Sequence, residues 1–108
     1  MNLNREQLTR LYLIVSSGLV ERERVAHRAY FDPLLDEQDL ATLRDAICSN
    51  HHVESFAFSW QYSETAHCFM WSSFLYTNWG KFHAERDRYA EAICDVALQY
   101  AAEVLNDV

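Results

Sequence analysis

Residues 53–77 have the sequence VESFAFSWQYSETAHCFMWSSFLYT, and the structure of this stretch decides the fold class of the whole chain. Phe56, Phe58, Trp60 and Tyr62 alternate with small or polar residues, which is the period of a β-strand. A helix fits as well, because one stripe at helical spacing contains Val53, Phe56, Ala57, Trp60, Glu64, His67, Trp71, Phe74 and Leu75.

A hairpin in this stretch would have to turn within residues 63–66, which contain no Gly, Asn or Asp. Tight turns between strands usually rely on those residues. We therefore predict a helix over 53–77 and keep one aromatic hairpin, around residues 54–76, as the alternative.

The chain on either side of this stretch favours helices. Among 108 residues there are only two glycines and one proline, few for a sheet protein with frequent turns. Asn4 and Gln7 form a capping-box pattern at the start of a first helix. A second helix is expected over residues 19–30, with its apolar residues facing the core: Val25, Ala26, Ala29 and Tyr30.

Two further helices complete the prediction. Asp32-Pro33 marks a boundary, Asp36 is a possible helix cap, and a third helix then runs to about Cys48. The last helix is expected over residues 78–105, with an apolar face made of Phe82, Tyr89, Ile93, Val96, Tyr100 and Val104. The sequence thus predicts an all-α fold: a compact bundle of four to five helices in a single domain over 1–108. The alternative hairpin would make the fold α+β.

Charge is distributed unevenly along the chain. Residues 1–31 contain five arginines and three acids, whereas residues 32–64 contain seven acids and only one base, Arg44. Residues 65–108 have six acids and three bases, and the formal net charge is −7. Capping of a helix needs one or two carboxylates, not seven, so the middle third predicts an acidic surface for a basic partner. The candidate partner-binding residues are Asp32, Asp36, Glu37, Asp39, Asp45 and Glu54.

The same charge argues against direct binding of nucleic acid, which needs a basic face to displace counterions. A basic protein suits the acidic surface better, including an effector complex whose basic groove normally holds DNA or RNA. The least polar stretch, residues 66–80, is too short and too often interrupted by polar residues to span a bilayer, so we expect no membrane partner.

Cysteine and histidine do not form a known metal-binding or catalytic motif. Cys48, Cys68 and Cys94 are odd in number and widely spaced, which favours free thiols in a reducing compartment. Glu64-x-x-His67 is one half of a di-iron signature, but the second half is absent. Cys48 with His51 and His52, or His67 with Cys68, matches no common zinc spacing. We expect no catalytic residue, no metal and no cofactor, and the protein is predicted not to be an enzyme.

In size, acidity and expected helical character the chain resembles the small acidic inhibitors of phages and mobile elements, anti-CRISPR proteins among them. The resemblance implies a cytoplasmic protein of a bacterial host whose carboxylates occupy a basic nucleic-acid path on a defence complex, among them Asp36, Glu37, Asp39, Asp45 and Glu54. Lys81 is the only lysine among nine basic residues, which is typical of a GC-rich bacterial or phage coding sequence.

Two alternatives stay open beside the inhibitor. One is an antitoxin or regulatory protein that masks a basic partner. The other, from a different class, is a metal-binding or catalytic helical bundle. The oligomeric state does not follow from the sequence.

Overall fold

The computed structural model describes residues 1–106 and contains both helices and a sheet. Its helices are α1 (Arg5–Ser16), α2 (Glu21–Tyr30), α3 (Glu37–Cys48) and α4 (Tyr89–Asn106), and its strands are β1 (Val53–Ser63), β2 (Cys68–Thr77) and β3 (Gly80–Arg86). The prediction of an all-α helical bundle is therefore wrong, and the fold is α+β.

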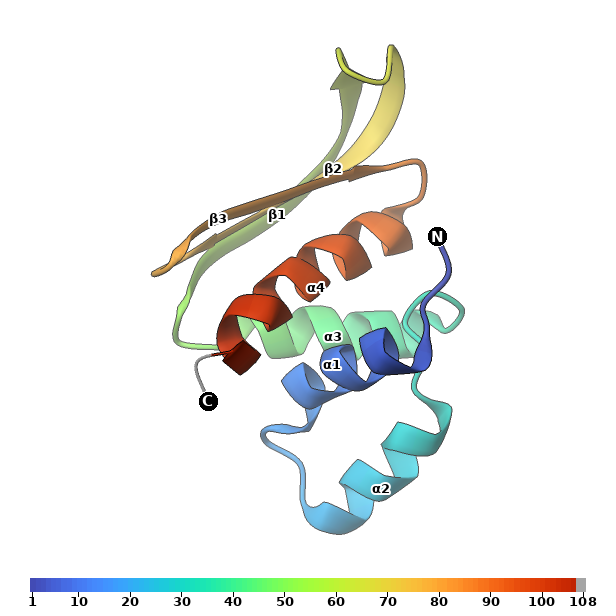
Figure 1. Cartoon of the computed structure of the whole chain (residues 1–108), viewed down its shortest axis with the longest axis vertical. Coiled ribbons are helices and arrows are strands. Elements are labelled where there is room, and N and C mark those ends of the chain that lie inside the picture. The colour runs from blue at the N-terminus through green and yellow to red at the C-terminus, as the bar shows by residue number, and fades with distance from the viewer. Residues whose placement is uncertain (107–108) are drawn as a thin grey trace.

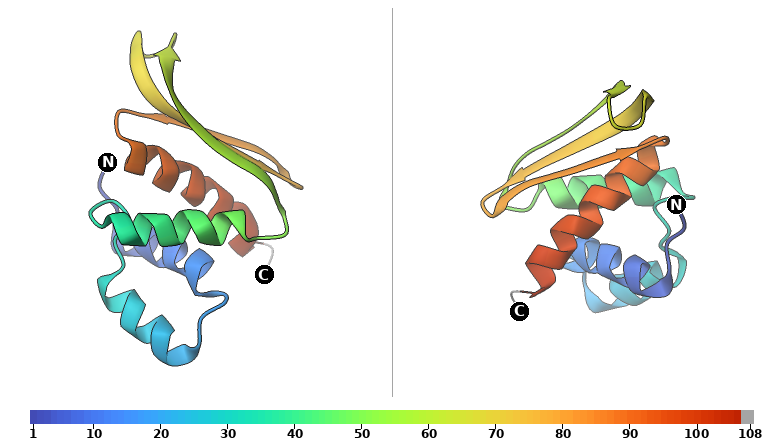
Figure 2. Two further views of the ribbon diagram at one scale, coloured as in Figure 1. Left: turned by 180° about the vertical axis from the view of Figure 1, so that it is seen from behind. Right: turned by 45° about the horizontal axis from the view of Figure 1, so that its top comes forward.

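The three strands form one antiparallel sheet in the order β1-β2-β3. α4 crosses one face of this sheet, α3 and α1 lie beneath α4, and α2 lies farthest from the sheet (Figure 1). The views in Figure 2 show that the helices all lie on the same side, so the other face of the sheet has no helix over it.

Residues 53–77 form β1 and β2 because their two-residue period matches the face that the helices cover. Phe56 is opposite Leu75, Phe58 is opposite Ser73, and β3 continues the same face with Phe82 and Ala84. The two-residue period puts Phe56, Phe58, Trp60 and Tyr62 of β1 on the same side as Phe69, Trp71 and Leu75 of β2, whereas Phe74 and Tyr76 lie on the other side with His83 and Lys81.

The hairpin turns without glycine because His67 adopts a left-handed conformation with φ of 58°. The backbone N–H of His67 donates to the carbonyl of Ser63 at 2.8 Å, and the N–H of Ala66 donates to the Ser63 hydroxyl at 3.2 Å. Histidine is among the non-glycine residues that adopt this conformation more often than most, although at a cost in free energy. Sequence reasoning missed the turn because it looked only for Gly, Asn and Asp.

The predicted last helix begins eleven residues too early. Thr77 is paired with Gly80 across a two-residue turn, Asn78-Trp79, and residues 80–86 are a strand. Gly80 has φ of 139°, a conformation that favours glycine, and the Thr77 hydroxyl donates to its carbonyl at 3.0 Å. α4 starts only at Tyr89.

The predicted capping signals are confirmed. Asn4 accepts from the N–H of Gln7, and the Gln7 side chain accepts from the N–H of Asn4, which completes the capping box of α1. Asp36 caps α3 by accepting from the N–H groups of Gln38 and Asp39.

The core lies between α4, the sheet and the pair α1–α3. Its fully buried side chains include Leu11, Leu43, Ile47, Leu75, Ile93, Val96 and Tyr100. A buried polar contact also joins the sheet to α4: the Ser73 hydroxyl donates to the carbonyl of Ala92 at 2.7 Å. α2 has no share in this core, since all ten of its residues are exposed. The prediction that Val25, Ala26, Ala29 and Tyr30 face the core is therefore wrong.

None of the helices within residues 1–106 is both long enough and apolar enough to cross a bilayer.

Candidate protein-binding surface

The far end of the β1–β2 hairpin extends beyond the rest of the sheet. β3 pairs with β2 only from Trp71 to Thr77, so the distal hairpin, residues 60–71, is mostly a two-stranded ribbon. It projects past the start of α4, and no helix lies under its tip (Figure 1). The helix-side face of this ribbon is therefore open to solvent.

Aromatic side chains cover that open face. By register, Trp60 is opposite Trp71 and Tyr62 is opposite Phe69, so all four are on the face that elsewhere packs on the helices. The ring centroids of Trp60 and Phe69 are 6.2 Å apart in a stacked arrangement, and those of Trp60 and Trp71 are 5.7 Å apart. Trp60, Tyr62 and Phe69 nevertheless expose 52%, 52% and 56% of their surface.

Tyr89, the first residue of α4, connects the distal hairpin to the body. Its ring makes edge contacts with Phe58 and Trp71, at centroid distances of 4.8 and 5.2 Å. Its hydroxyl oxygen accepts a hydrogen bond from the Arg44 guanidinium at 3.1 Å. This hydrogen bond is the main reason that the pKa of Arg44 is raised above its ordinary value, so this residue stays charged. We call Trp60, Tyr62, Phe69, Trp71 and Tyr89 the aromatic surface.

A groove of about 520 Å³ adjoins the aromatic surface at Tyr89. It lies between the turn before α3, the first half of α3 and the start of α4. Its lining includes the acids Asp36 and Glu37, the bases Arg44 and Arg88, and the exposed Leu35. The charges of the groove are therefore mixed, with its carboxylates at the N-terminus of α3.

The structure places the six predicted partner-binding carboxylates in three different settings. Asp32, Asp36 and Asp39 bind the chain's own backbone: Asp32 accepts from the N–H of Leu34, Asp39 from that of Asp32, and Asp36 caps α3. Glu37 and Asp45 are exposed on α3, and an Asp45 oxygen is 4.0 Å from the Arg44 guanidinium.

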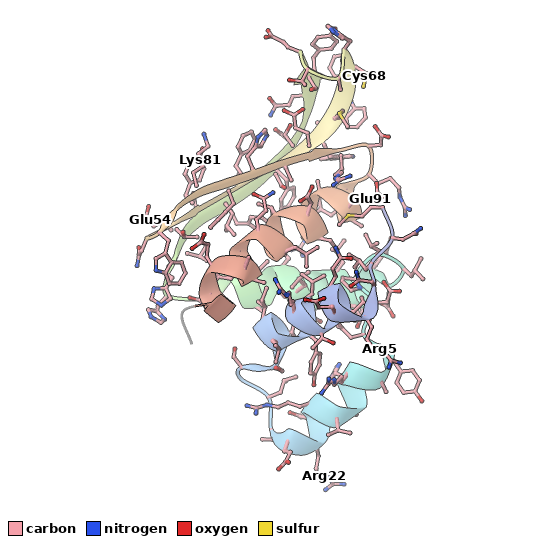
Figure 3. The ribbon with its side chains drawn as sticks, viewed as in Figure 1. Arg5, Arg22, Glu54, Cys68, Lys81 and Glu91 are labelled. Atoms are coloured by element: carbon pink, nitrogen blue, oxygen red, sulfur yellow. The ribbon has the colours of Figure 1, made fainter. Side chains whose placement is uncertain are left out.

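Glu54 is in the third setting, far from the others. It lies at an irregularity in the strand register at the start of β1, at the end of the sheet opposite the distal hairpin (Figure 3). The six carboxylates thus do not form one compact patch, and only Asp36 and Glu37 line the groove.

The remaining acids of the chain are partly neutralised. Glu91 is buried beside the N-terminal ammonium group at 2.6 Å, and Asp95 pairs with Arg86 at 2.9 Å. Within residues 1–106, no three side chains among His, Cys, Asp and Glu come together as a metal site. The His83 ring nitrogen Nε2 is 3.6 Å from one carboxylate oxygen of Glu85 on the uncovered face of the sheet, and the other Glu85 oxygen accepts a hydrogen bond from the Ser63 hydroxyl.

The thiols differ in accessibility. Cys48 and Cys68 are exposed and Cys94 is buried. Burial raises the pKa of Cys94 to about 12. Partial burial, together with the nearby Asp45, also raises the pKa of Cys48, so neither thiol is an activated nucleophile at neutral pH.

Comparison of the chain with models of protein families, with curated proteins and with solved structures finds no match. From the sequence, most aromatic residues within 56–82 are expected in the core, with one or two exposed interface anchors as the alternative, and the structure exposes Trp60, Tyr62 and Phe69. A signal for this exposure is that the aromatic alternation reaches Tyr62, one residue before β1 ends at Ser63.

Proposed function

We propose that this chain is a non-enzymatic binding module that uses the aromatic surface and the adjoining carboxylates of α3 to hold a basic surface of another protein. The observation that carries the proposal is the exposure of Trp60, Tyr62 and Phe69, each by more than half, on a projecting hairpin. Tryptophan and tyrosine in this setting are typical energetic anchors of protein interfaces.

Three properties of the protein favour a basic partner. The faces of Trp60 and Tyr62 attract cations, so arginine or lysine side chains can stack on them. Glu37 lines the groove and Asp45 is exposed farther along α3, and neither carboxylate accepts a backbone hydrogen bond within the described residues. The net charge of −7 steers basic proteins toward the molecule at low ionic strength.

The proposed mode of action is steric. A partner whose basic surface binds DNA or RNA would have that surface covered by the aromatic hairpin, in the manner of a small phage inhibitor of a defence complex. No chemical step is involved, because binding alone excludes the nucleic acid.

The test is a pull-down from bacterial extract in parallel with three variants, followed by identification and purification of the retained protein. Trp60→Ser with Phe69→Ser removes the aromatic anchors. Glu37→Lys with Asp45→Lys reverses the α3 carboxylates. Glu54→Lys with Glu103→Lys makes the same change in charge far from the site and is the matched control.

We expect a basic partner that the parent and the control retain and the other two variants lose. Binding of the purified partner should weaken as salt rises, and DNA or RNA should compete with it. The proposal is wrong if the partner binds all four proteins equally, or if nucleic acid and this chain bind it at the same time.

A further inference from the structure

β1 lies at one edge of the sheet, and no strand of the described chain pairs with its outer side. In the left view of Figure 2, β1 runs in front of the other two strands and no helix lies in front of it. It is the longest of the three strands, with eleven residues, and its register is irregular only at the start, between Val53 and Ser55. Residues 55–63 are therefore a regular free edge, which we call the β1 edge.

The register decides which backbone groups point outward from the β1 edge. Along an antiparallel strand, the N–H and C=O groups of successive residues bond alternately to the neighbours on either side. The two-residue turn makes Thr77 and Gly80 a hydrogen-bonded pair between β2 and β3. Tyr76 and every second residue before it therefore bond to β1, where their partners are Ser55, Ala57, Ser59, Gln61 and Ser63. The backbone groups of the residues between these point outward: Phe56, Phe58, Trp60 and Tyr62.

Nothing in the described chain satisfies this row of outward groups. Within residues 1–106, none of the four N–H and four C=O groups makes a hydrogen bond. The opposite edge of the sheet is protected, since the Gln99 side chain on α4 donates to the outward carbonyl of His83 at 2.9 Å. β3 also carries the charged Lys81 and Glu85, which hinder the addition of a strand. Residues 55–63, in contrast, contain no charged residue, no glycine and no proline.

A row of alternating donors and acceptors at strand spacing fits an extended peptide backbone. A helix cannot satisfy the row, because its own backbone groups bond within the helix. An added strand would place every second side chain on the face of Trp60 and Tyr62, with Cα atoms about 5.5 Å from theirs. Basic side chains at those positions reach the ring faces. Glu54 and Glu64, one at each end of the β1 edge, favour a basic segment as well.

We propose that the basic partner contributes an extended segment that adds to the β1 edge as a fourth strand, with arginine or lysine at alternate positions facing Trp60 and Tyr62. This inference rests on the proposed function, since it names the part of the partner that the aromatic surface contacts. A second copy of the chain suits the edge less well, because each copy has a net charge of −7 and the two repel each other.

The test is amide hydrogen exchange of the ¹⁵N-labelled chain, followed for each residue by nuclear magnetic resonance, with an Arg-Leu-Arg-Leu-Arg peptide. In the free protein we expect slow exchange at Ala57 and Ser59, whose N–H groups bond to β2, and fast exchange at Phe58, Trp60 and Tyr62. Saturating peptide should slow exchange at these last three amides by at least about ten-fold, because they then donate to the added strand.

Two N-methylated peptides are the matched controls, since they keep the side chains and charges of the parent peptide. In the added strand, the arginine N–H groups point toward β1 and the leucine N–H groups point away from it. N-methylation of the second and third arginines should therefore abolish the protection of Phe58, Trp60 and Tyr62. N-methylation of both leucines should preserve it.

The strand addition and the proposed function fail in different ways. If the peptide shifts the indole signals of Trp60 and Trp71 without slowing exchange at Phe58 and Trp60, the rings hold basic groups and strand addition is wrong. Equal protection by the arginine-methylated peptide overturns it too. No effect of any peptide at millimolar concentration contradicts both proposals. Protection in the free protein that grows with protein concentration assigns the β1 edge to a second copy and also contradicts the strand from a partner.

Discussion

At the scale of single residues, buried polar and titratable groups set how the fold responds to pH. Cys94 is fully buried in α4, and burial raises its pKa to about 12. Burial also raises the pKa of Tyr100, whose hydroxyl has no hydrogen-bond partner among the described residues. Both groups are neutral in the folded protein at a pH where they would ionise in the unfolded chain.

The raised pKa values predict that stability is lost at high pH. Below about pH 9 both states hold the Cys94 proton, and the free energy of unfolding does not depend on this group. From about pH 9 to 12 only the unfolded chain loses that proton, so the free energy of unfolding falls. Urea unfolding between pH 7 and 11 measures this slope. Cys94→Ala should reduce the slope even if the variant is less stable at pH 7, and an unchanged slope would contradict the account.

At the scale of elements, the hairpin turn has a residue that fits it imperfectly. His67 adopts φ of 58°, which costs an L-residue with a side chain roughly 1 kcal/mol relative to glycine. The turn holds because Ser63 accepts hydrogen bonds from both Ala66 and His67. The position is exposed, so its side chain contributes no buried surface.

His67→Gly should therefore raise the free energy of unfolding by about 0.5–1 kcal/mol, since it removes the steric cost of the left-handed conformation. Ala66→Gly, one residue earlier, has no such cost to relieve and should lower stability by a few tenths of a kcal/mol to 1 kcal/mol. Thermal or urea unfolding of both variants gives the comparison. Equal losses of stability in the two variants would show that the turn is not strained at His67.

Helix caps could be predicted from the sequence, whereas the strands and the exposure of α2 could not. The caps at Asn4 and Asp36 were predictable because they depend on residues two or three positions away. Residues 53–77 satisfied both a helical and a strand period, and the choice between them depends on pairing with β3 and on packing against α4, which residues outside this stretch supply. Local patterns do not contain that information. The exposure of α2 was missed for a related reason, since its apolar residues indicate a buried face but not what buries it.

At the scale of the whole molecule, the protein measures 45 × 30 × 20 Å. The distal hairpin and α2 lie at opposite ends of its long axis (Figure 1). The distal hairpin carries exposed aromatic rings, and α2 carries exposed aliphatic residues with both signs of charge. The candidate site was predictable from sequence only in part. Its acidic character followed from the composition, whereas the separation of Glu54 from Glu37 could be seen only in the folded structure.

Nuclear magnetic resonance of the three tryptophan indoles measures whether the aromatic surface holds basic groups. An Arg-Leu-Arg-Leu-Arg peptide is added to ¹⁵N-labelled protein, with a Glu-Leu-Glu-Leu-Glu peptide as the control. Trp60 and Trp71 belong to the aromatic surface, whereas Trp79 lies in the β2–β3 turn at the other end of the sheet, against His52. We predict that the arginine peptide shifts the indole signals of Trp60 and Trp71 and leaves the indole signal of Trp79 unchanged. In the double variant Glu37→Lys with Asp45→Lys, the peptide should no longer shift the signals of Trp60 and Trp71. No shift at Trp60 and Trp71 at millimolar peptide, or the same shifts with the glutamate peptide, would contradict the account.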